Sequence, residues 1–182
     1  MDVEKQKKII KEKCELCNGK NVVFGDGPLD ANIMFIGEAP GFNEDRLGKP
    51  FVGRAGKFLD ELLKTVNLNR RDVYISNIVK CRPPKNRDPT PEEINQFYPF
   101  LDLEIKEIKP KIIIPLGRHA TKTIFERYNL KFDGISVEHG KIYKVSTLFG
   151  EIKIAPMYHP AAAIYNPNLK DVLKEDLKKI IE

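Results

Sequence analysis

The stretch ANIMFIGEAPG, residues 31–41, decides the fold, because an unbroken apolar run there ends in a glycine- and proline-rich turn. A continuous run of this kind is typical of a strand that is buried on both faces, as in a parallel sheet covered by helices. Two similar runs follow along the chain, VYISNIV at 73–79 and KIIIPL at 111–116. The three runs predict three strands of one parallel sheet.

Helical patterns separate these runs. Apolar residues recur at helical spacing between 58 and 66, and Thr90-Pro91-Glu92-Glu93 is a capping box that predicts a helix start. Further helices are predicted at 4–13, 117–128 and about 169–182, and shorter strands at 141–145 and 151–155. Strands that alternate with helices imply right-handed crossovers. We therefore expect a single α/β domain over residues 1–182, a three-layer α/β/α sandwich around a mostly parallel sheet.

Composition limits the class of protein. The chain has 182 residues, 31% of them charged, and a net charge of +5. This balance suits an acidic partner such as nucleic acid without requiring one. No apolar run reaches the roughly 18 residues of a membrane span, and the N-terminus lacks the apolar centre of a signal peptide. We expect a cytoplasmic protein that does not associate with membranes, and a monomer, because nothing in the sequence favours an obligate dimer.

The candidate site residues follow the predicted strands. Glu38 and Glu44 lie in the loop after the first run, and Phe51 precedes glycines that can open a helix. Asn77 lies near the end of the second run, and His159 lies in a His-Pro turn after the last strand. Because ligands bind at the carboxyl ends of strands in such sheets, we expect these side chains to share one edge. An aromatic ring, carboxylates and a histidine suit the binding of a flat heterocycle and the cleavage of a bond beside it.

Each of these residues also has an ordinary structural interpretation when taken alone: a tight turn, a core ring or a cap. His119 at a helix start and His139 in a turn are weaker candidates than His159. A basic cluster around two prolines could be a solvated loop, or it could bind phosphates. Its members are Lys80, Arg82, Lys85 and Arg87. The order of these features along the chain is more informative than any one of them.

Five segments together closely resemble the family 4 uracil-DNA glycosylases of archaea and bacteria: GEAPGFNED, GKPFVGRAGKFLD, VYISNIVKCRPPKNRDPTPEEI, PLGRHA and YHPAAA. The similarity covers nearly the whole chain with compatible spacing. It implies a DNA repair enzyme that hydrolyses the N-glycosidic bond of uracil in single- or double-stranded DNA and leaves an abasic site. It further implies a central four-stranded parallel sheet and an iron–sulfur cluster held by four cysteines. Whether a replication clamp is a partner stays open.

The resemblance also implies how the substrate is held. The target uracil must leave the stack before it can reach a pocket. Phe51 is expected to stack on the flipped ring, and Asn77 to read its Watson–Crick edge. Glu44 is expected near the C5 edge, where it would crowd the methyl group of thymine. The backbone at Ala39 and Gly41 is expected to frame the pocket.

Two residues are expected to carry the chemistry. Cleavage leaves negative charge on O2 of the base, and His159 is expected to donate a hydrogen bond there. Glu38 is expected to position the attacking water and to oppose the positive charge that develops on the sugar. The basic cluster is expected to contact the DNA backbone.

The cysteines depart from the family pattern. Cys14, Cys17 and Cys81 match three of the four cluster ligands, and Phe97 stands sixteen residues after Cys81, where the fourth is expected. Phenylalanine cannot bind iron. The alternatives are a four-iron cluster with an open or oxygen-donor position, a three-iron cluster, a zinc ion, or no metal. We favour a cluster held by the three cysteines. The odd cysteine count argues against a disulfide scaffold.

Two other classes of function stay open at this stage. One is an iron–sulfur redox or sensor protein, for which the cysteines are essential and the pocket is incidental. The other is a module that binds damaged DNA without turnover.

Overall fold

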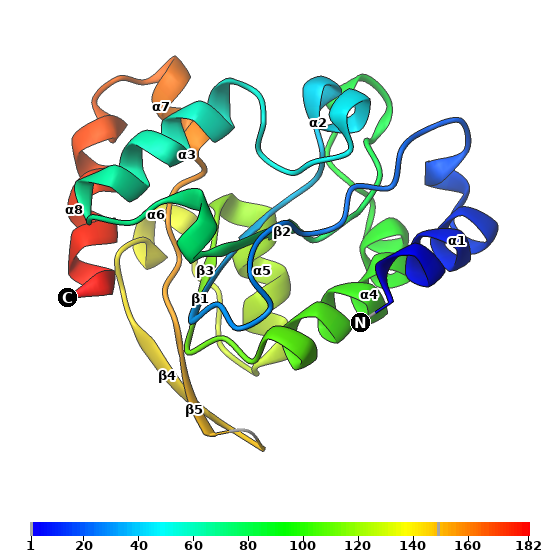
Figure 1. Ribbon diagram of the computed structural model, residues 1–182. Helices are drawn as coiled ribbons and strands as arrows, with labels where there is room; N and C mark the ends of the chain where they lie inside the picture. The colour runs from blue at the N-terminus through cyan, green and yellow to red at the C-terminus, as the bar shows by residue number, and fades with distance from the viewer. Residues whose placement is uncertain (1, 149) are drawn as a thin grey trace.

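The computed structural model describes residues 2–148 and 150–182, with a five-stranded sheet at its centre. The strand order is β2-β1-β3-β5-β4; β4 is antiparallel to β5, and the other pairs are parallel (Figure 1). The strands are β1 (Ile33–Gly37), β2 (Tyr74–Asn77), β3 (Ile112–Pro115), β4 (Tyr143–Thr147) and β5 (Gly150–Ile154). The predicted α/β fold with a mostly parallel sheet is confirmed. The four parallel strands that the family implies are joined by one antiparallel edge strand.

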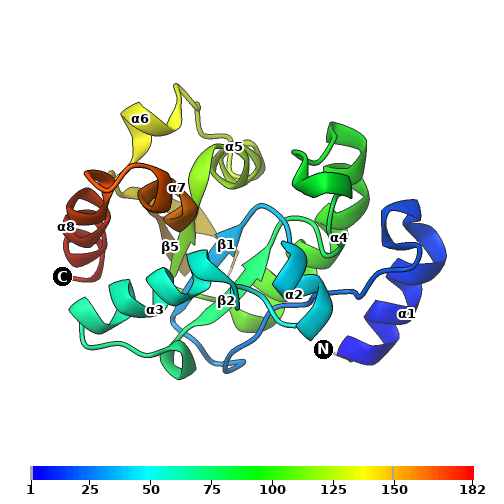
Figure 2. The ribbon, with the colours of Figure 1, turned by 90° about the horizontal axis from the view of Figure 1, so that it is seen from above.

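Helices cover both faces of the sheet (Figures 1 and 2). Their bounds are α1 (Val3–Lys13), α2 (Phe42–Leu47), α3 (Arg54–Thr65), α4 (Pro91–Ile108), α5 (Gly117–Arg127), α6 (Ile135–Glu138), α7 (Pro160–Tyr165) and α8 (Leu169–Ile181). Residues of α3, α7 and α8 share one core with the sheet, and residues of α1, α4 and α5 share the other. Within residues 2–148 and 150–182, none of the helices has the length and hydrophobicity that a bilayer crossing requires.

The apolar run that forms β1 is buried on both faces, as its pattern predicts. Phe35 packs into the core with α3 and α8, whereas Met34 and Ile36 pack into the core with α4 and α5. Burial of a side chain of this size contributes about 1.5–3 kcal/mol. β1 is thereby fixed between the two helical layers, and the residues after Gly37 emerge at the carboxyl edge of the sheet.

The second apolar run continues past Asn77 alongside the residues that follow β1. The backbone N–H groups of Ile78 and Val79 donate to the carbonyl oxygens of Gly37 and Glu38, at 2.9 and 3.1 Å. These bonds join the loop after β1 to the loop after β2.

The helix start predicted at Thr90 is confirmed. Its hydroxyl accepts a hydrogen bond from the N–H of Glu93 at 3.2 Å, and the Glu93 carboxylate accepts one from the N–H of Thr90 at 2.8 Å. This reciprocal pair begins α4 and also ends the basic loop that precedes it.

Candidate active site

A cavity of about 340 Å³ lies at the carboxyl edge of the sheet, where the loops after β1 and β2 meet the start of α7. Figure 2 looks down on this edge and shows α2, α3 and α7 around it. Seven residues that the sequence singles out line this cavity, together with Arg87 from the basic cluster: Glu38, Ala39, Gly41, Glu44, Phe51, Asn77 and His159. The structure thus brings together side chains that lie up to about 120 residues apart in the sequence.

Phe51 and Asn77 converge above Gly37, the last residue of β1. A Cβ atom added at Gly37 would lie 2.4 Å from Oδ1 of Asn77 and 2.6 Å from Cζ of Phe51. Any side chain at this position would therefore displace both. Gly37 pairs with Asn77 in the β1–β2 ladder, so the amide is placed by the sheet itself.

Phe51 adopts an uncommon backbone conformation, with φ at 51°. A residue other than glycine in this region costs about 1–3 kcal/mol and persists when its surroundings impose it. Arg70 supplies part of that constraint, since its guanidinium donates to the carbonyl oxygens of Pro50 and Phe51 and to Asp60. The Phe51 ring also stacks on His159, with centroids 5.6 Å apart and planes inclined by 29°. The loop therefore holds the ring in one orientation beside the histidine.

Glu44 anchors the same loop from the other side. Its Oε1 atom accepts hydrogen bonds from the N–H groups of Val52 and Gly53, at 2.8 and 2.7 Å. Gly53 is the N-cap of α3, so this carboxylate satisfies backbone donors at the helix start. Its Oε2 atom lies 2.8 Å from where a Cβ of Gly41 would stand. A role of Glu44 at the C5 edge of a base stays a prediction.

His159 is the N-cap of α7 and is held in one tautomer. Its Nδ1 atom accepts a hydrogen bond from the N–H of Ala161 at 3.1 Å. Desolvation lowers the pKa of His159 to about 4, against a smaller opposing effect of Glu44. The ring is therefore neutral near pH 7, and because Nδ1 is the acceptor, Nε2 carries the proton. The site contains a neutral imidazole with one N–H group to donate.

Glu38 follows β1 directly, and its side chain is 28% exposed. Burial raises the pKa of its carboxyl, His119 and Arg118 lower it, and Asp88 raises it. Sequence reasoning ranked His119 below His159, yet its Nε2 atom lies 4.0 Å from Oε2 of Glu38. The position of His119 in the sequence could have indicated this proximity, because it lies in the first helical turn after β3, at the same edge of the sheet.

Lys80 is buried, so its predicted contact with the DNA backbone is corrected. Its side chain is 0% exposed and forms an ion pair with the equally buried Glu104 of α4. Its Nζ atom also donates to Oγ of Ser76 and to the carbonyl of Asn77, both at 2.8 Å. An ammonium group in this position supports the end of β2 and cannot contact a phosphate.

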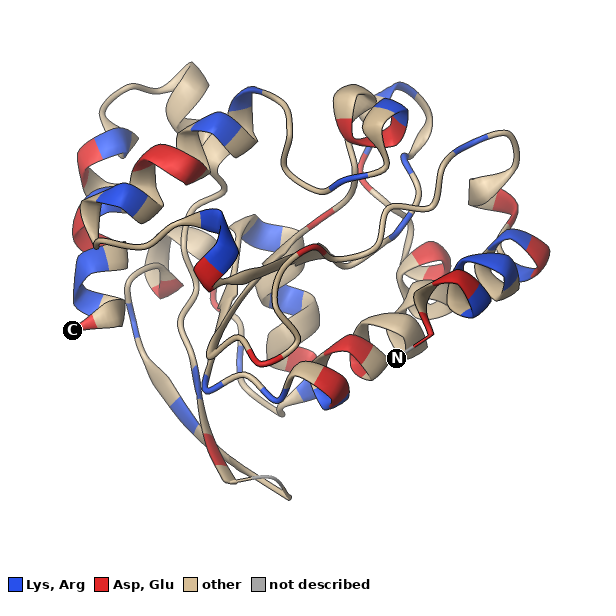
Figure 3. Cartoon of the chain, viewed as in Figure 1, with Lys and Arg blue, Asp and Glu red and all other residues tan. Residues whose placement is uncertain are grey.

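The other basic residues lie on the loop between β2 and α4. Arg82 donates from Nε to Oδ1 of Asn86 at 2.7 Å, and its guanidinium lies 5.2 Å from the centroid of the Phe42 ring. Arg87 forms two hydrogen bonds with the Glu93 carboxylate, at 2.8 and 2.6 Å. Lys85 is exposed. Basic and acidic residues are interspersed along α1 and α8 (Figure 3), whereas Arg87 of this loop lines the cavity.

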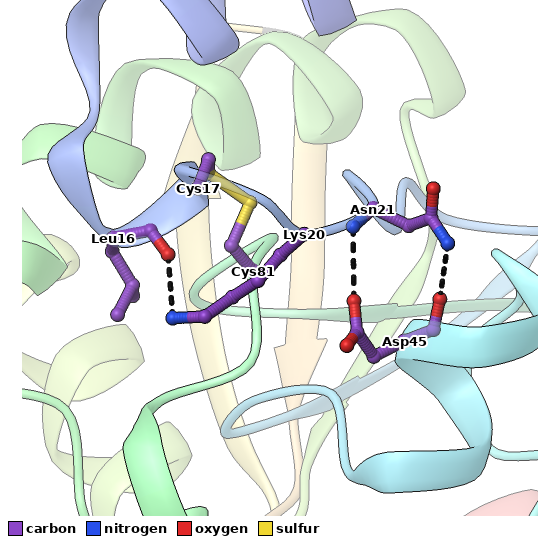
Figure 4. Close-up of a disulfide and its surroundings, with 6 residues drawn as sticks. All are labelled: Leu16, Cys17, Lys20, Asn21, Asp45 and Cys81. Carbon is purple, nitrogen blue, oxygen red and sulfur yellow. Dashed lines mark hydrogen bonds between the residues drawn. A yellow bond between two sulfur atoms is a disulfide. The ribbon is translucent and has the colours of Figure 1, made fainter.

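The cysteines form a different arrangement from the expected ligand set. Cys17 and Cys81 are joined in a disulfide, with Cα atoms 5.3 Å apart (Figure 4). Cys14 is free and buried, and burial raises the pKa of its thiol. Phe97 is 0% exposed in the same core as all three cysteines. With two sulfurs bonded to each other and a phenyl ring at the fourth position, the residues present do not fit a four-iron cluster. The argument from the odd cysteine count against a disulfide is corrected as well.

The disulfide and nearby hydrogen bonds fasten the N-terminal segment to the site loops. Asn21 donates to Asp45 of α2 through its backbone N–H at 2.9 Å and through its amide at 2.6 Å (Figure 4). The disulfide closes a span of 64 residues between this segment and the basic loop.

Among the described residues, one other group of potential metal ligands includes Glu38, which lines the cavity. Ligand atoms of Glu38, Asp88 and His119 all lie within 4.8 Å of one another. Arg118, however, places its guanidinium 3.2 Å from Oδ2 of Asp88 and 2.9 Å from Nε2 of His119. A cation would have to displace this guanidinium, so we assign no metal to the group.

Comparison with known proteins identifies the class. The family model described as the Uracil DNA glycosylase superfamily matches residues 24–181. A protein of Sulfurisphaera tokodaii named Type-4 uracil-DNA glycosylase is 51% identical over 180 residues, which cover 98% of this chain and 82% of that protein. Proteins of the same name from Archaeoglobus fulgidus and Thermotoga maritima are 47% and 42% identical, covering 93% and 92% of this chain and 86% and 88% of theirs. The chain belongs to the type-4 family of uracil-DNA glycosylases.

Proposed function

We propose that this protein removes uracil from DNA by hydrolysing the N-glycosidic bond and leaving an abasic site. The observation that carries the proposal is the cavity that Phe51, Asn77, Glu38 and His159 line together. Its volume of about 340 Å³ falls within the usual range of small-ligand sites, about 300–1,000 Å³. Family membership supports the same reaction.

Phe51 and Asn77 recognise the base. A uracil turned out of the stack would enter the cavity, at a cost of a few kcal/mol for the lost stacking. The Asn77 amide donates to O4 and accepts from N3–H, whereas cytosine presents the opposite pattern at these atoms. Asn77 is 2% exposed, so a mismatched base would leave its polar atoms buried without partners.

His159 stabilises the departing base. As the bond between C1′ and N1 breaks, its electron pair leaves with uracil and places negative charge on O2. The Nε2–H group of the neutral imidazole donates to that oxygen. A donor of this kind is worth about 3–4 kcal/mol, or 10²–10³ in rate. The hydrogen bond from Ala161 to Nδ1 supports this assignment, because it leaves the proton on Nε2.

Glu38 acts on the sugar side of the bond. Its carboxylate orients a water molecule toward C1′ and opposes the positive charge that develops on the ring. The water oxygen bonds to C1′, and the released proton passes to Glu38. Arg82, Lys85 and Arg87 hold the DNA backbone at the edge of the cavity. Binding of a replication clamp and a monomeric state stay predictions.

The test is single-turnover cleavage of a single-stranded oligonucleotide with one deoxyuridine, in excess EDTA. His159→Ala should lower the rate by 10²–10³, as loss of an oxyanion donor does. Tyr165→Ala at the other end of α7, where the side chain is 86% exposed, is the matched control and should cleave normally. A normal rate in His159→Ala would reject the role of this residue. A damage-binding module would retain the oligonucleotide and release no base, and a redox sensor would depend on the cysteines instead.

A further inference from the structure

A pair of side chains outside the predicted site lies against Glu38. His119 is in the first turn of α5, and Asp88 is in the loop that leads into α4. Nε2 of His119 lies 2.9 Å from Oδ2 of Asp88 and 4.0 Å from Oε2 of Glu38. Arg118 is a further charged group here, and its Nη2 atom lies 3.2 Å from Asp88 and 2.9 Å from His119.

We propose that His119 and Asp88 are a positioning pair that sets the charge state and orientation of Glu38. The proposal rests on the role given to Glu38 in the proposed function. Neither residue touches the reacting atoms. Both act through the carboxylate that directs the water.

Glu38 needs such partners because its surroundings oppose ionisation. Burial raises the pKa of its carboxyl, and a protonated carboxyl group orients water less well than a carboxylate. His119 and Arg118 counter the effect of burial, since positive charge or an N–H group beside Glu38 favours its ionised form. Asp88 acts in the opposite direction on Glu38 and at the same time holds the imidazole in place.

The pair also joins two elements that are distant in sequence. His119 follows β3 in α5, whereas Asp88 precedes α4, so both α4 and β3 lie between the two residues in the sequence. Asp88 directly follows Arg87, which lines the cavity and donates to the Asp88 carbonyl at 2.9 Å. The pair therefore connects the basic loop, the start of α5 and the carboxylate after β1.

The opposite signs of the two effects give the test. His119→Ala should move the acidic limb of the single-turnover pH–rate profile to higher pH, and Asp88→Asn should move it to lower pH. Both variants alter the same 2.9 Å contact, so a purely structural role would move the acidic limb in the same direction in the two variants. A shift of half a pH unit corresponds to about a threefold change in rate on the acidic side. Lys122→Ala, on the exposed side of α5, should leave the limb unchanged.

A readout independent of activity separates this proposal from the proposed function. The ¹³C NMR titration of the labelled Glu38 carboxyl should show the same opposite shifts in His119→Ala and Asp88→Asn. Shifts of the same sign, or no shifts, would overturn the pair even if the wild-type protein releases uracil. Opposite shifts in a protein that releases no uracil would uphold the pair and reject the reaction.

Discussion

The buried ion pair of Lys80 and Glu104 makes Lys80→Met the most informative single change for the scaffold of the site. Both side chains are 0% exposed, so the substitution leaves the Glu104 carboxylate inside the protein without its counter-charge. Removal of one partner of a buried pair typically costs 3–5 kcal/mol. For a protein of this length that loss lowers Tm by about 6–20 °C. The carbonyl of Asn77 also loses the donor that holds it.

The contacts of Glu104 predict that the loss can be reversed. Its Oε1 atom accepts from the N–H of Gly25 and from the Tyr74 hydroxyl, at 2.8 and 3.1 Å, and Oε2 accepts from Ser76 at 2.8 Å. A glutamine at position 104 can keep the contacts with Gly25 and Tyr74 through its carbonyl oxygen, and its NH2 group can donate to Oγ of Ser76, which no longer accepts from Lys80. The double variant Lys80→Met/Glu104→Gln should therefore recover most of the stability, because replacing both members of a buried pair is often nearly neutral.

The assay is urea unfolding at neutral pH and 25 °C for the wild type, both single variants and the double variant. We expect a coupling energy of about 2 kcal/mol or more between the two positions, within the range of contacting residues. We also expect Lys80→Met to weaken binding of a uracil-containing oligonucleotide, because Asn77 loses its support. A loss below about 1 kcal/mol for Lys80→Met, or additive effects in the double variant, would refute the reasoning.

Three further predictions concern the disulfide, the histidine and the basic loop. Cys81→Ser should lower the free energy of unfolding by up to about 4 kcal/mol, because the disulfide closes a span of 64 residues. Iron and sulfide assays on protein purified without oxygen should find no four-iron cluster, and four irons per chain would contradict the disulfide. His159 should destabilise the fold in acid, because its pKa falls from 6.5 to about 4 on folding and the unfolded chain therefore binds more protons between these values. The loss of unfolding free energy should reach about 3 kcal/mol below pH 4 and should disappear in His159→Gln. An equal loss in that variant would exclude His159 as its source. The double variant Arg82→Ala/Lys85→Ala should reduce the slope of log K against log salt concentration for DNA binding by the equivalent of about two phosphate contacts. Lys178→Ala on α8 is the control. An unchanged slope in the double variant would show that the loop does not contact the DNA.

Much of the fold follows from pattern alone. The unbroken runs before Gly37 and Asn77 are strands because apolar side chains must be covered on both faces, and the edge at which they end is where the cavity lies. The His-Pro turn likewise fixes His159 at the start of α7. These features depend on neighbours in the sequence, which is why the sequence predicts them.

The features that sequence reasoning missed depend on partners far away in the chain. Lys80 resembles the basic residues beside it, and only the position of Glu104 on α4 makes it a buried support. His119 is a candidate positioning residue because it contacts Asp88, which lies on a different loop. The pairing of Cys17 with Cys81 depends on a close approach of two segments that spacing does not specify. Charge and thiol chemistry are visible in the sequence, but their partners are not.

Base release is the most direct measurement of the central claim, which is that one cavity binds a flipped uracil and breaks its bond to the sugar. A single-stranded oligonucleotide that carries one deoxyuridine among thymidines and deoxycytidines is incubated with the wild-type protein in EDTA, and the free bases are measured by mass spectrometry. The account predicts one free uracil and one abasic site per strand, with no free thymine or cytosine. An intact oligonucleotide after incubation with folded protein, or equal release of cytosine, would contradict it.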